Sequence, residues 1–216
     1  MRWGMIIDLN KCVGCYSCVI ACKQEHFLPP KTFWCRLLIS ESGNFPTVTK
    51  EIYPVLCNHC ANPKCAEVCP TGATIQREDG IVWIDGNKCV GCRYCVMACP
   101  YQVRTYYSDG DREYFLGQGL TEFEEIGKKL YPHQTGTVFK CNFCMERIDA
   151  GVRNGLKPGV DPEATPACVI SCPANARYFG DLDDPFSEVS IMKKEKKGQP
   201  LHPEFGTEPS VYYILR

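Results

Sequence analysis

The sequence predicts an α+β fold made of two small modules, with the second inserted into the first. Three observations lead to this prediction: the spacing of the cysteines, an internal repeat, and a short apolar run before each copy of the repeat. The chain has 216 residues, 17 of them cysteine, and a formal net charge of −1 at pH 7. This length suffices for one large or two small domains, and the near-neutral charge gives no indication of a nucleic-acid partner.

Sixteen of the cysteines fall into four groups of four, and only Cys35 is left over. The groups are Cys12, Cys15, Cys18 and Cys22; Cys57, Cys60, Cys65 and Cys69; Cys89, Cys92, Cys95 and Cys99; and Cys141, Cys144, Cys168 and Cys172. Groups one and three have the spacing C-x2-C-x2-C-x3-C. In bacterial ferredoxins three thiolates of this run bind one [4Fe-4S] cluster and the fourth binds another. The fourth cysteine lies about one helical turn further on and faces away.

The first group belongs to a repeat. Ile7–Lys23 aligns with Ile84–Pro100 without a gap, with 12 identities in 17 positions. Gly14 and Gly91 stand where the ligand loop needs a conformationally free residue. The apolar runs 5–7 and 81–84 predict strands, so the repeated unit is strand, ligand loop and short helix, which is half of a ferredoxin-like module.

The two helices of the repeat are expected to end differently. Pro100 stops its helix at the last cysteine of the group. Lys23 allows the first helix to continue through Gln24 and Glu25, until Pro29 and Pro30 break it.

Each half-module needs a partner half, so four groups make two modules. Groups two and three are adjacent and both end in Cys-Pro, which makes them the simplest pair; groups one and four then pair across the chain. We expect one module at 1–50 plus 131–192 and the inserted module at 51–110. The stretch 145–167, which splits group four, is rich in glycine, proline and charge and predicts a surface loop.

The remaining segments predict connections and an interface. Residues 111–130 connect the modules, and the T-E-F-E run at 121–124 predicts a capping box that opens a helix to about Leu130. We expect residues 193–216 to form a C-terminal arm with a solvated, charged start, which either binds a partner or is a flexible linker. Its run 211–215 predicts a strand that either returns to a sheet or reaches a partner.

Several residues outside the ligand groups have alternative interpretations. Lys11, Lys88 and Lys140 each precede a first ligand, and they either compensate cluster charge or are solvated surface lysines. His59 either modulates a cluster or makes a backbone hydrogen bond. We expect Phe143 to shield a cluster from water, Trp34 to belong to the core, and the adjacent Cys35 to be a buried or idle thiol rather than a fifth site.

Two other cysteine chemistries fit the pattern less well. A disulfide framework suits a secreted chain, but no secretory signal is visible and the number of cysteines is odd. Structural zinc favours two C-x2-C pairs, often with histidine, and leaves the x3-C arm without a use.

Four stretches carry a resemblance to a known family: C-N-H-C-A-N-P-K-C-A-E-V-C-P-T-G-A at 57–73, K-C-N-F-C at 140–144, P-A-C-V-I-S-C-P-A-N-A-R-Y-F-G-D at 166–181 and G-T-E-P-S-V-Y-Y-I at 206–214. With the cysteine groups, they resemble the four-cluster iron–sulfur subunits of the dimethyl-sulfoxide-reductase family of molybdopterin (molybdenum or tungsten) oxidoreductases. The resemblance covers nearly the whole chain. One departure is Asn175, where glycine is common in the family, and it affects a local turn.

The resemblance implies four sets of cluster ligands, which we number here. Set 1 is Cys12, Cys15, Cys18 and Cys172; set 2 is Cys57, Cys60, Cys65 and Cys99; set 3 is Cys89, Cys92, Cys95 and Cys69; set 4 is Cys141, Cys144, Cys168 and Cys22. Some relatives have tryptophan at one group-three cysteine and hold a three-iron cluster. Since Cys92 is intact, four [4Fe-4S] clusters are expected.

The resemblance also implies the function. The chain would relay single electrons between a molybdopterin-bearing catalytic subunit, near the group-one and group-four module, and a membrane quinone-reactive subunit or other redox partner. No nucleophile–base pattern and no glycine-rich dinucleotide loop stands out, so we do not expect the chain to be an enzyme by itself. The alternatives are a free-standing cytoplasmic polyferredoxin and a structural zinc module.

The N-terminal residues lack the features of a secretory signal, and no apolar run approaches the ~20 residues of a membrane span. We therefore expect no direct membrane span. The chain is expected either in the cytoplasm or exported with a signal-bearing catalytic subunit.

Overall fold

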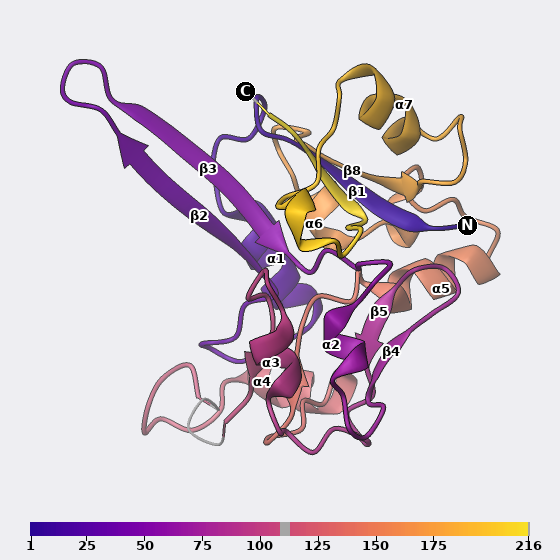
Figure 1. The fold of residues 1–216 in the computed structure, drawn as a ribbon. Coiled ribbons are helices and arrows are strands. Elements are labelled where there is room, and N and C mark those ends of the chain that lie inside the picture. Colours follow the sequence, from indigo (N-terminus) through magenta and orange to yellow (C-terminus); the bar gives the residue numbers. More distant parts are fainter. Residues whose placement is uncertain (109–112, 216) are drawn as a thin grey trace.

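The computed structural model of the protein describes residues 1–108 and 113–215. Short helices and short strands are mixed along the chain, as an α+β fold requires (Figure 1). The strands are β1 (Trp3–Asp8), β2 (Cys35–Ser42), β3 (Thr49–Leu56), β4 (Thr74–Gln76), β5 (Val82–Ile84), β6 (Thr105–Tyr106), β7 (Val138–Phe139), β8 (Arg177–Asp181) and β9 (Val211–Ile214). The helices are α1 (Ser17–Glu25), α2 (Lys64–Glu67), α3 (Tyr94–Ala98), α4 (Glu122–Leu130), α5 (Met145–Arg153), α6 (Ala167–Ile170) and α7 (Glu188–Glu195), with 3-10 turns η2 (Pro162–Ala164) and η3 (Pro203–Phe205).

The central sheet joins both ends of the chain. Its strand order is β8-β1-β9, with β1 antiparallel to β8 and parallel to β9. Met5, Ile6 and Ile7 of β1 are completely buried, because one face of the strand packs into the main core and the other packs under α7. The strand predicted at 5–7 is therefore confirmed, and it holds the N-terminal and C-terminal segments side by side.

The segment predicted as a C-terminal arm is part of this folded body. Its expected start, Lys193, lies inside α7, which begins at the N-cap Ser187 and packs Val189 and Met192 against the sheet. The strand expected at 211–215 is β9, and it returns to the central sheet. The sequence did not predict this helix, because its C-terminal end belongs to the charged run K-K-E-K-K. Only two buried side chains, one turn apart, give the helix an apolar face.

Elements from the middle of the chain lie together in the lower part of Figure 1. There α2 lies between α3 and the β4–β5 hairpin, and it contacts both α3 and β4. Strand β5 confirms the strand predicted at 81–84. Helix α4 has the predicted capping box, with Thr121 and Glu124 bonded reciprocally. The module boundaries stay predictions; those at 110 and 111 fall outside the described residues.

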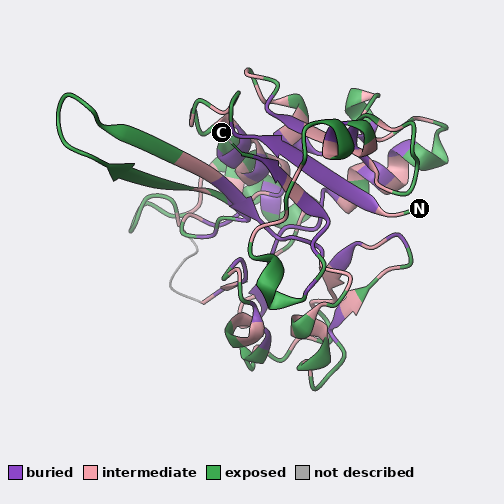
Figure 2. Ribbon diagram, turned by 45° about the horizontal axis from the view of Figure 1, so that its top comes forward, coloured by how far each residue is buried: buried purple, intermediate pink, exposed green. Residues whose placement is uncertain are grey.

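The β2–β3 hairpin projects from the body (Figure 1). Cys35, Val55 and Leu56 at its base are buried, whereas its outer half is exposed (Figure 2). Residues near its tip include Phe45, of which 92% is exposed.

The two helices of the repeat end differently, as expected, but Pro29 and Pro30 do not end the first one, because α1 already ends at the C-cap His26. Helix α1 continues to Glu25, three residues past Cys22, and α3 ends at Ala98, just before Cys99 and Pro100. The surface loop expected at 145–167 is wrong in its first half, because α5 occupies Met145–Arg153; in the second half, η2 adds one 3-10 turn. Ile148 and Gly151 form the buried side of α5, and Gly151 packs directly on Ala164. No helix within the described residues combines the length and the apolar character needed to cross a membrane.

Candidate metal centres

Three of the four expected cysteine sets surround cavities. Each cavity encloses a few hundred cubic ångströms, part of it open to solvent. The set 1 cysteines line about 370 Å³, the set 2 cysteines about 360 Å³ and the set 3 cysteines about 310 Å³. In every case the structure places three cysteines of one group beside the last cysteine of another.

The fourth set is the most deeply buried. Cys22, Cys141, Cys144 and Cys168 are all buried, and they come from α1, from the loop after β7 and from α6. Burial raises the pKa of the Cys22 thiol well above its ordinary value, and the thiols of Cys141, Cys144 and Cys168 raise it further. The last cysteine of group one therefore lies among the first three of group four.

Left-handed backbone shapes the ligand loops. Gly14 has φ +68° and Gly91 has φ +66°, so both adopt the conformation that favours glycine. Tyr16 and Arg93, two residues further on, are also left-handed and form the N-caps of α1 and α3. Asn175 has φ +46°, which asparagine tolerates better than most residues. The turn is therefore made without the family's usual glycine.

The sets adjoin one another in the order 1–4–2–3. Arg177 lines the set 1 cavity and donates to the Sγ of Cys168 in set 4. His59 and Phe143, which belong to the loops of sets 2 and 4, stack with ring centroids 3.7 Å apart. Arg104 lines the set 2 cavity and donates to Thr74, which lines the set 3 cavity.

The two end sets reach the surface. Cys15 of set 1 and Cys92 of set 3 are exposed, whereas the four cysteines of set 4 are buried. Exposed apolar residues flank both ends at equivalent positions of the repeat: Val13 (66%) and Ile20 (51%) at one, Val90 (67%) and Met97 (85%) at the other.

The three lysines before the ligand groups differ in environment. Lys11 and Lys88 are exposed, which supports the interpretation as solvated surface lysines. Lys140 is buried, and its Nζ donates to the carbonyls of Val82 and Cys141. The three stand in equivalent sequence positions, and no local signal separates them.

His59, Phe143, Trp34 and Cys35 lie in the interior, as expected for Trp34 and Cys35. His59 makes the backbone hydrogen bond of its simpler interpretation: its Nδ1 accepts from the Val82 amide at 3.0 Å. Burial, followed by the charge of Lys140, lowers its pKa well below the ordinary value, so the ring is neutral. Phe143, Trp34 and Cys35 are buried as well. Cys35 contacts Arg177 Nη2 at 3.2 Å and Cys18 Sγ at 3.9 Å.

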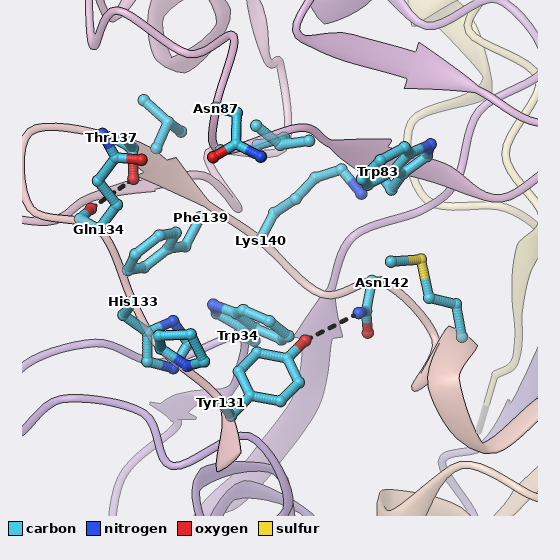
Figure 3. A pocket seen from close by; sticks show the side chains of 15 residues that line it. Trp34, Trp83, Asn87, Tyr131, His133, Gln134, Thr137, Phe139, Lys140 and Asn142 are labelled. Atoms are coloured by element: carbon cyan, nitrogen blue, oxygen red, sulfur yellow. Dashed lines mark hydrogen bonds between the residues drawn. The ribbon is translucent and has the colours of Figure 1, made fainter. Parts of the chain in front are cut away.

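Another cavity, on the described part of the chain, has no cysteine in its lining, and nothing in the sequence indicated it. It encloses about 1100 Å³, including space open to solvent. Figure 3 shows Trp34 among Tyr131, His133 and Phe139, while the Lys140 side chain runs along another wall toward Trp83. Because Ile84 and Val138 line both this cavity and that of set 3, the two are neighbours.

The donor sets fit iron–sulfur clusters. All 17 cysteines are free thiols, and thiolates are the ligands of [4Fe-4S] clusters. Within 1–108 and 113–215, no three histidine, cysteine or acidic side chains converge to hold a single metal ion. At the set 2 cavity, Nε and Nη2 of the buried Arg104 have no hydrogen-bond partner among these residues. Such N–H groups suit an anionic, sulfur-rich neighbour.

Comparisons with known proteins agree with this chemistry. Residues 48–113 match a 4Fe-4S dicluster domain family, and residues 3–24 match a 4Fe-4S binding domain family. The chain is 40% identical to a putative dimethyl sulfoxide reductase iron-sulfur subunit of Halobacterium salinarum, over 99% of this chain and 79% of that protein. It is 39% identical to a selenate reductase subunit of Mesobacillus selenatarsenatis and 38% identical to a tetrathionate reductase subunit of Salmonella typhimurium, each over 99% of this chain and 72% of the relative.

Proposed function

The chain belongs to the family of iron–sulfur subunits of the dimethyl-sulfoxide-reductase family of molybdopterin oxidoreductases, and we propose that it relays single electrons through four [4Fe-4S] clusters. It does so between a molybdopterin-bearing catalytic subunit and a membrane quinone-reactive subunit or other redox partner. The chain carries electrons and does not itself transform a substrate. The observation that carries the proposal is the arrangement of sixteen cysteines in four adjoining sets, with exposed cysteines only in the two end sets.

Each set of four cysteines is proposed to hold one cluster. Set 1 would bind through Cys12, Cys15, Cys18 and Cys172; set 2 through Cys57, Cys60, Cys65 and Cys99; set 3 through Cys89, Cys92, Cys95 and Cys69; set 4 through Cys141, Cys144, Cys168 and Cys22. The cavities lined by sets 1 to 3 and the burial of set 4 support this assignment. With crossed ligation, groups one and four would form one module and groups two and three the other.

When bound, the clusters supply one-electron redox chemistry. The protein's part is to position them and to exclude water. Phe143 stacks on His59 between sets 4 and 2, and both side chains are buried. The interior sets differ in environment from the exposed ends. Because apolar burial and nearby dipoles tune the reduction potential of a redox site, the clusters would differ in potential as well.

The exposed ends are the proposed contact points for partners. Val13 and Ile20 beside Cys15, and Val90 and Met97 beside Cys92, give each end an apolar rim. Single exposed apolar residues are common, but here they recur at both ends around an exposed ligand. We assign the set 1 end to the catalytic subunit, and the set 3 end to the membrane subunit or other acceptor.

Metal and sulfide analysis of the anaerobically purified chain tests the cluster content. Four clusters require about 16 iron and about 16 sulfide per chain. Zinc without sulfide would overturn the proposal in favour of a structural zinc module. Purification from the native cell separates the remaining rival, since a polyferredoxin that serves several enzymes would not copurify with one large subunit.

Three substitutions, each followed by the spectra of the clusters in the purified chain, test the crossed ligation. Cys22→Ala should change the spectrum of the same cluster as Cys144→Ala, because both residues belong to set 4. Cys18→Ala, in the same group as Cys22 but in set 1, should change a different cluster. If Cys22→Ala instead reproduces Cys18→Ala, the ligands are not crossed.

A further inference from the structure

Three buried basic side chains lie at the three junctions between adjoining cysteine sets. Arg177 lies between sets 1 and 4, Lys140 between sets 4 and 2, and Arg104 between sets 2 and 3. Each is at most 5% exposed. None of the three forms an ion pair with a carboxylate in the part of the chain that the structure describes.

Arg177 is surrounded by sulfur. Its Nη1 lies 3.5 Å from Cys168 Sγ and 3.6 Å from Met5 Sδ, and its Nη2 lies 3.2 Å from Cys35 Sγ. It also lines the set 1 cavity. One guanidinium therefore contacts a set 4 ligand and faces the space enclosed by set 1.

Arg104 occupies the equivalent place in the other pair of sets. Both arginines follow the last cysteine of their group by five residues, in C-P-Y-Q-V-R at 99–104 and C-P-A-N-A-R at 172–177. Arg104 lines the set 2 cavity, and its Nη1 donates to Thr74 Oγ1 on the wall of the set 3 cavity. The same sequence position thus provides a cation between the two sets of each pair.

Lys140 lies where the two pairs meet. Its Nζ donates to the carbonyl of Cys141, a set 4 ligand, and to that of Val82, which lines the set 2 cavity. It lies on the chain next to set 4, and its ammonium group reaches the wall of set 2.

Burying an ion without a counter-ion costs several kcal/mol, so three such cations in one small protein require compensation. The anionic groups that can supply it are the cysteine thiolates and the clusters they would hold. An all-cysteine [4Fe-4S] centre carries a net charge of about −2 when oxidised and gains one more negative charge on reduction. A fixed positive charge therefore stabilises the reduced state more than the oxidised state.

We propose that the fixed positive charges of Arg177, Lys140 and Arg104 raise the reduction potentials of the two clusters beside each of them. This inference rests on the proposed function. Every junction of the path 1–4–2–3 then carries one fixed cation. Each cation acts on the donor and the acceptor of one electron transfer together, and it fills the space between them without adding a redox centre.

The experiment is a reductive titration of the purified four-cluster protein, followed by EPR, with Arg177→Gln, Arg104→Gln and Lys140→Gln. In Arg177→Gln, the ratio of reduced to oxidised centre at a fixed ambient potential should fall at least tenfold for two clusters. For a one-electron couple this equals 59 mV. The other two clusters should keep their potentials. Arg104→Gln should shift the potentials of the two clusters that Arg177→Gln leaves unchanged. Lys140→Gln should shift one cluster that responds to Arg177→Gln and one that responds to Arg104→Gln.

The test needs no prior assignment of EPR signals to clusters, because it compares only which signals shift together in the three variants. Arg177→Lys should restore most of the shift because it restores the charge, and Arg153→Gln, on the exposed side of α5, should shift nothing. Iron and sulfide content of each variant, near the wild-type value, shows that the clusters are retained. If Arg177→Gln loses iron, the proposal is decided by the other variants: Arg104→Gln should lower the potentials of two clusters, and Arg177→Lys should keep potentials near those of the wild type.

Two outcomes separate the possible failures. Four retained clusters with unchanged potentials in Arg104→Gln or Arg177→Gln would overturn the role of the cations and leave the proposed function intact. A wild-type chain without four clusters would instead overturn the proposed function and this inference with it.

Discussion

The two glycines of the repeated ligand loops occupy the same conformation but different surroundings. A Cβ added at Gly91 would lie 2.0 Å from the carbonyl oxygen of Gly136, which is backbone and cannot rotate away. A Cβ at Gly14 would meet the end of the Ile52 side chain at 2.7 Å. The repeat therefore explains why both positions need φ above zero, but only the structure shows that Gly91 is also fixed by a close backbone approach.

Gly91→Ala should destabilise the protein more than an alanine at a left-handed glycine with open surroundings. Gly72 is the matched control, because its φ is +64° and no atom lies within 4 Å of an added Cβ. The left-handed conformation alone costs about 1–2 kcal/mol for alanine, and the clash at Gly91 adds about 1–3 kcal/mol. The measurement is the urea concentration at which half of the cluster absorbance is lost; equal midpoints for the two variants would contradict the argument.

At the scale of elements, Arg147 joins the three segments that carry set 4. It lies on α5, three residues after Cys144. Its Nη1 donates to Glu25 at the end of α1 at 3.1 Å, and its Nε donates to the carbonyl of Thr165, three residues before Cys168, at 2.9 Å. The 23 residues that split group four are thus attached to the helix that provides Cys22.

Arg147→Met should selectively weaken the set 4 centre. Hydrogen bonds to charged groups contribute about 1.5–3 kcal/mol each, and partial exposure of this pair leads us to expect a total loss of about 2 kcal/mol. Under mild chelation, one of the four clusters should be lost faster than in the wild type. Arg153→Met, an exposed position on the same helix, should not change the rate. Uniform loss of all four clusters would contradict the assignment of Arg147 to set 4.

Elements with strong local signals were predictable, and elements defined by tertiary packing were not. The capping box fixed the start of α4, and the β-branched run at 81–84 fixed β5. Helices α5 and α7 were missed because their buried sides consist of a few small or apolar residues within charged sequence, which gain their stability from the neighbours they meet. Those neighbours are distant in sequence, so the local composition does not predict them.

Across the whole molecule, cysteine spacing predicted which residues gather but not how the four sets are ordered. Three cysteines of a group are close because the chain between them is short. The order 1–4–2–3 depends on Arg177, the His59–Phe143 stack and Arg104, which bring together segments distant in sequence. Nothing local in the sequence marks such contacts, although the shared C-P-x-x-x-R spacing could have indicated that the two arginines are equivalent.

That order has a consequence for partner binding, because it places equivalent faces of the repeat at opposite ends of the path. Val13 and Val90 occupy the same repeat position, beside the exposed Cys15 and Cys92. Val13→Glu should therefore weaken association with the catalytic subunit at least tenfold, since an unpaired charge buried at an interface costs more than the 1.4 kcal/mol that a factor of ten requires. Val90→Glu should weaken association with the other redox partner and leave the catalytic subunit bound.

Pull-down of each partner with each variant checks this assignment, with iron content measured alongside. Val160→Glu is the control, because Val160 is 75% exposed but lies outside both copies of the repeat. Both substitutions should leave the clusters intact, since neither valine is a ligand. If Val13→Glu and Val90→Glu release the same partner, the two ends do not serve separate partners, and electrons would have to enter and leave at one end. If the partners are exchanged, the two-ended path stands and its direction in the complex is reversed.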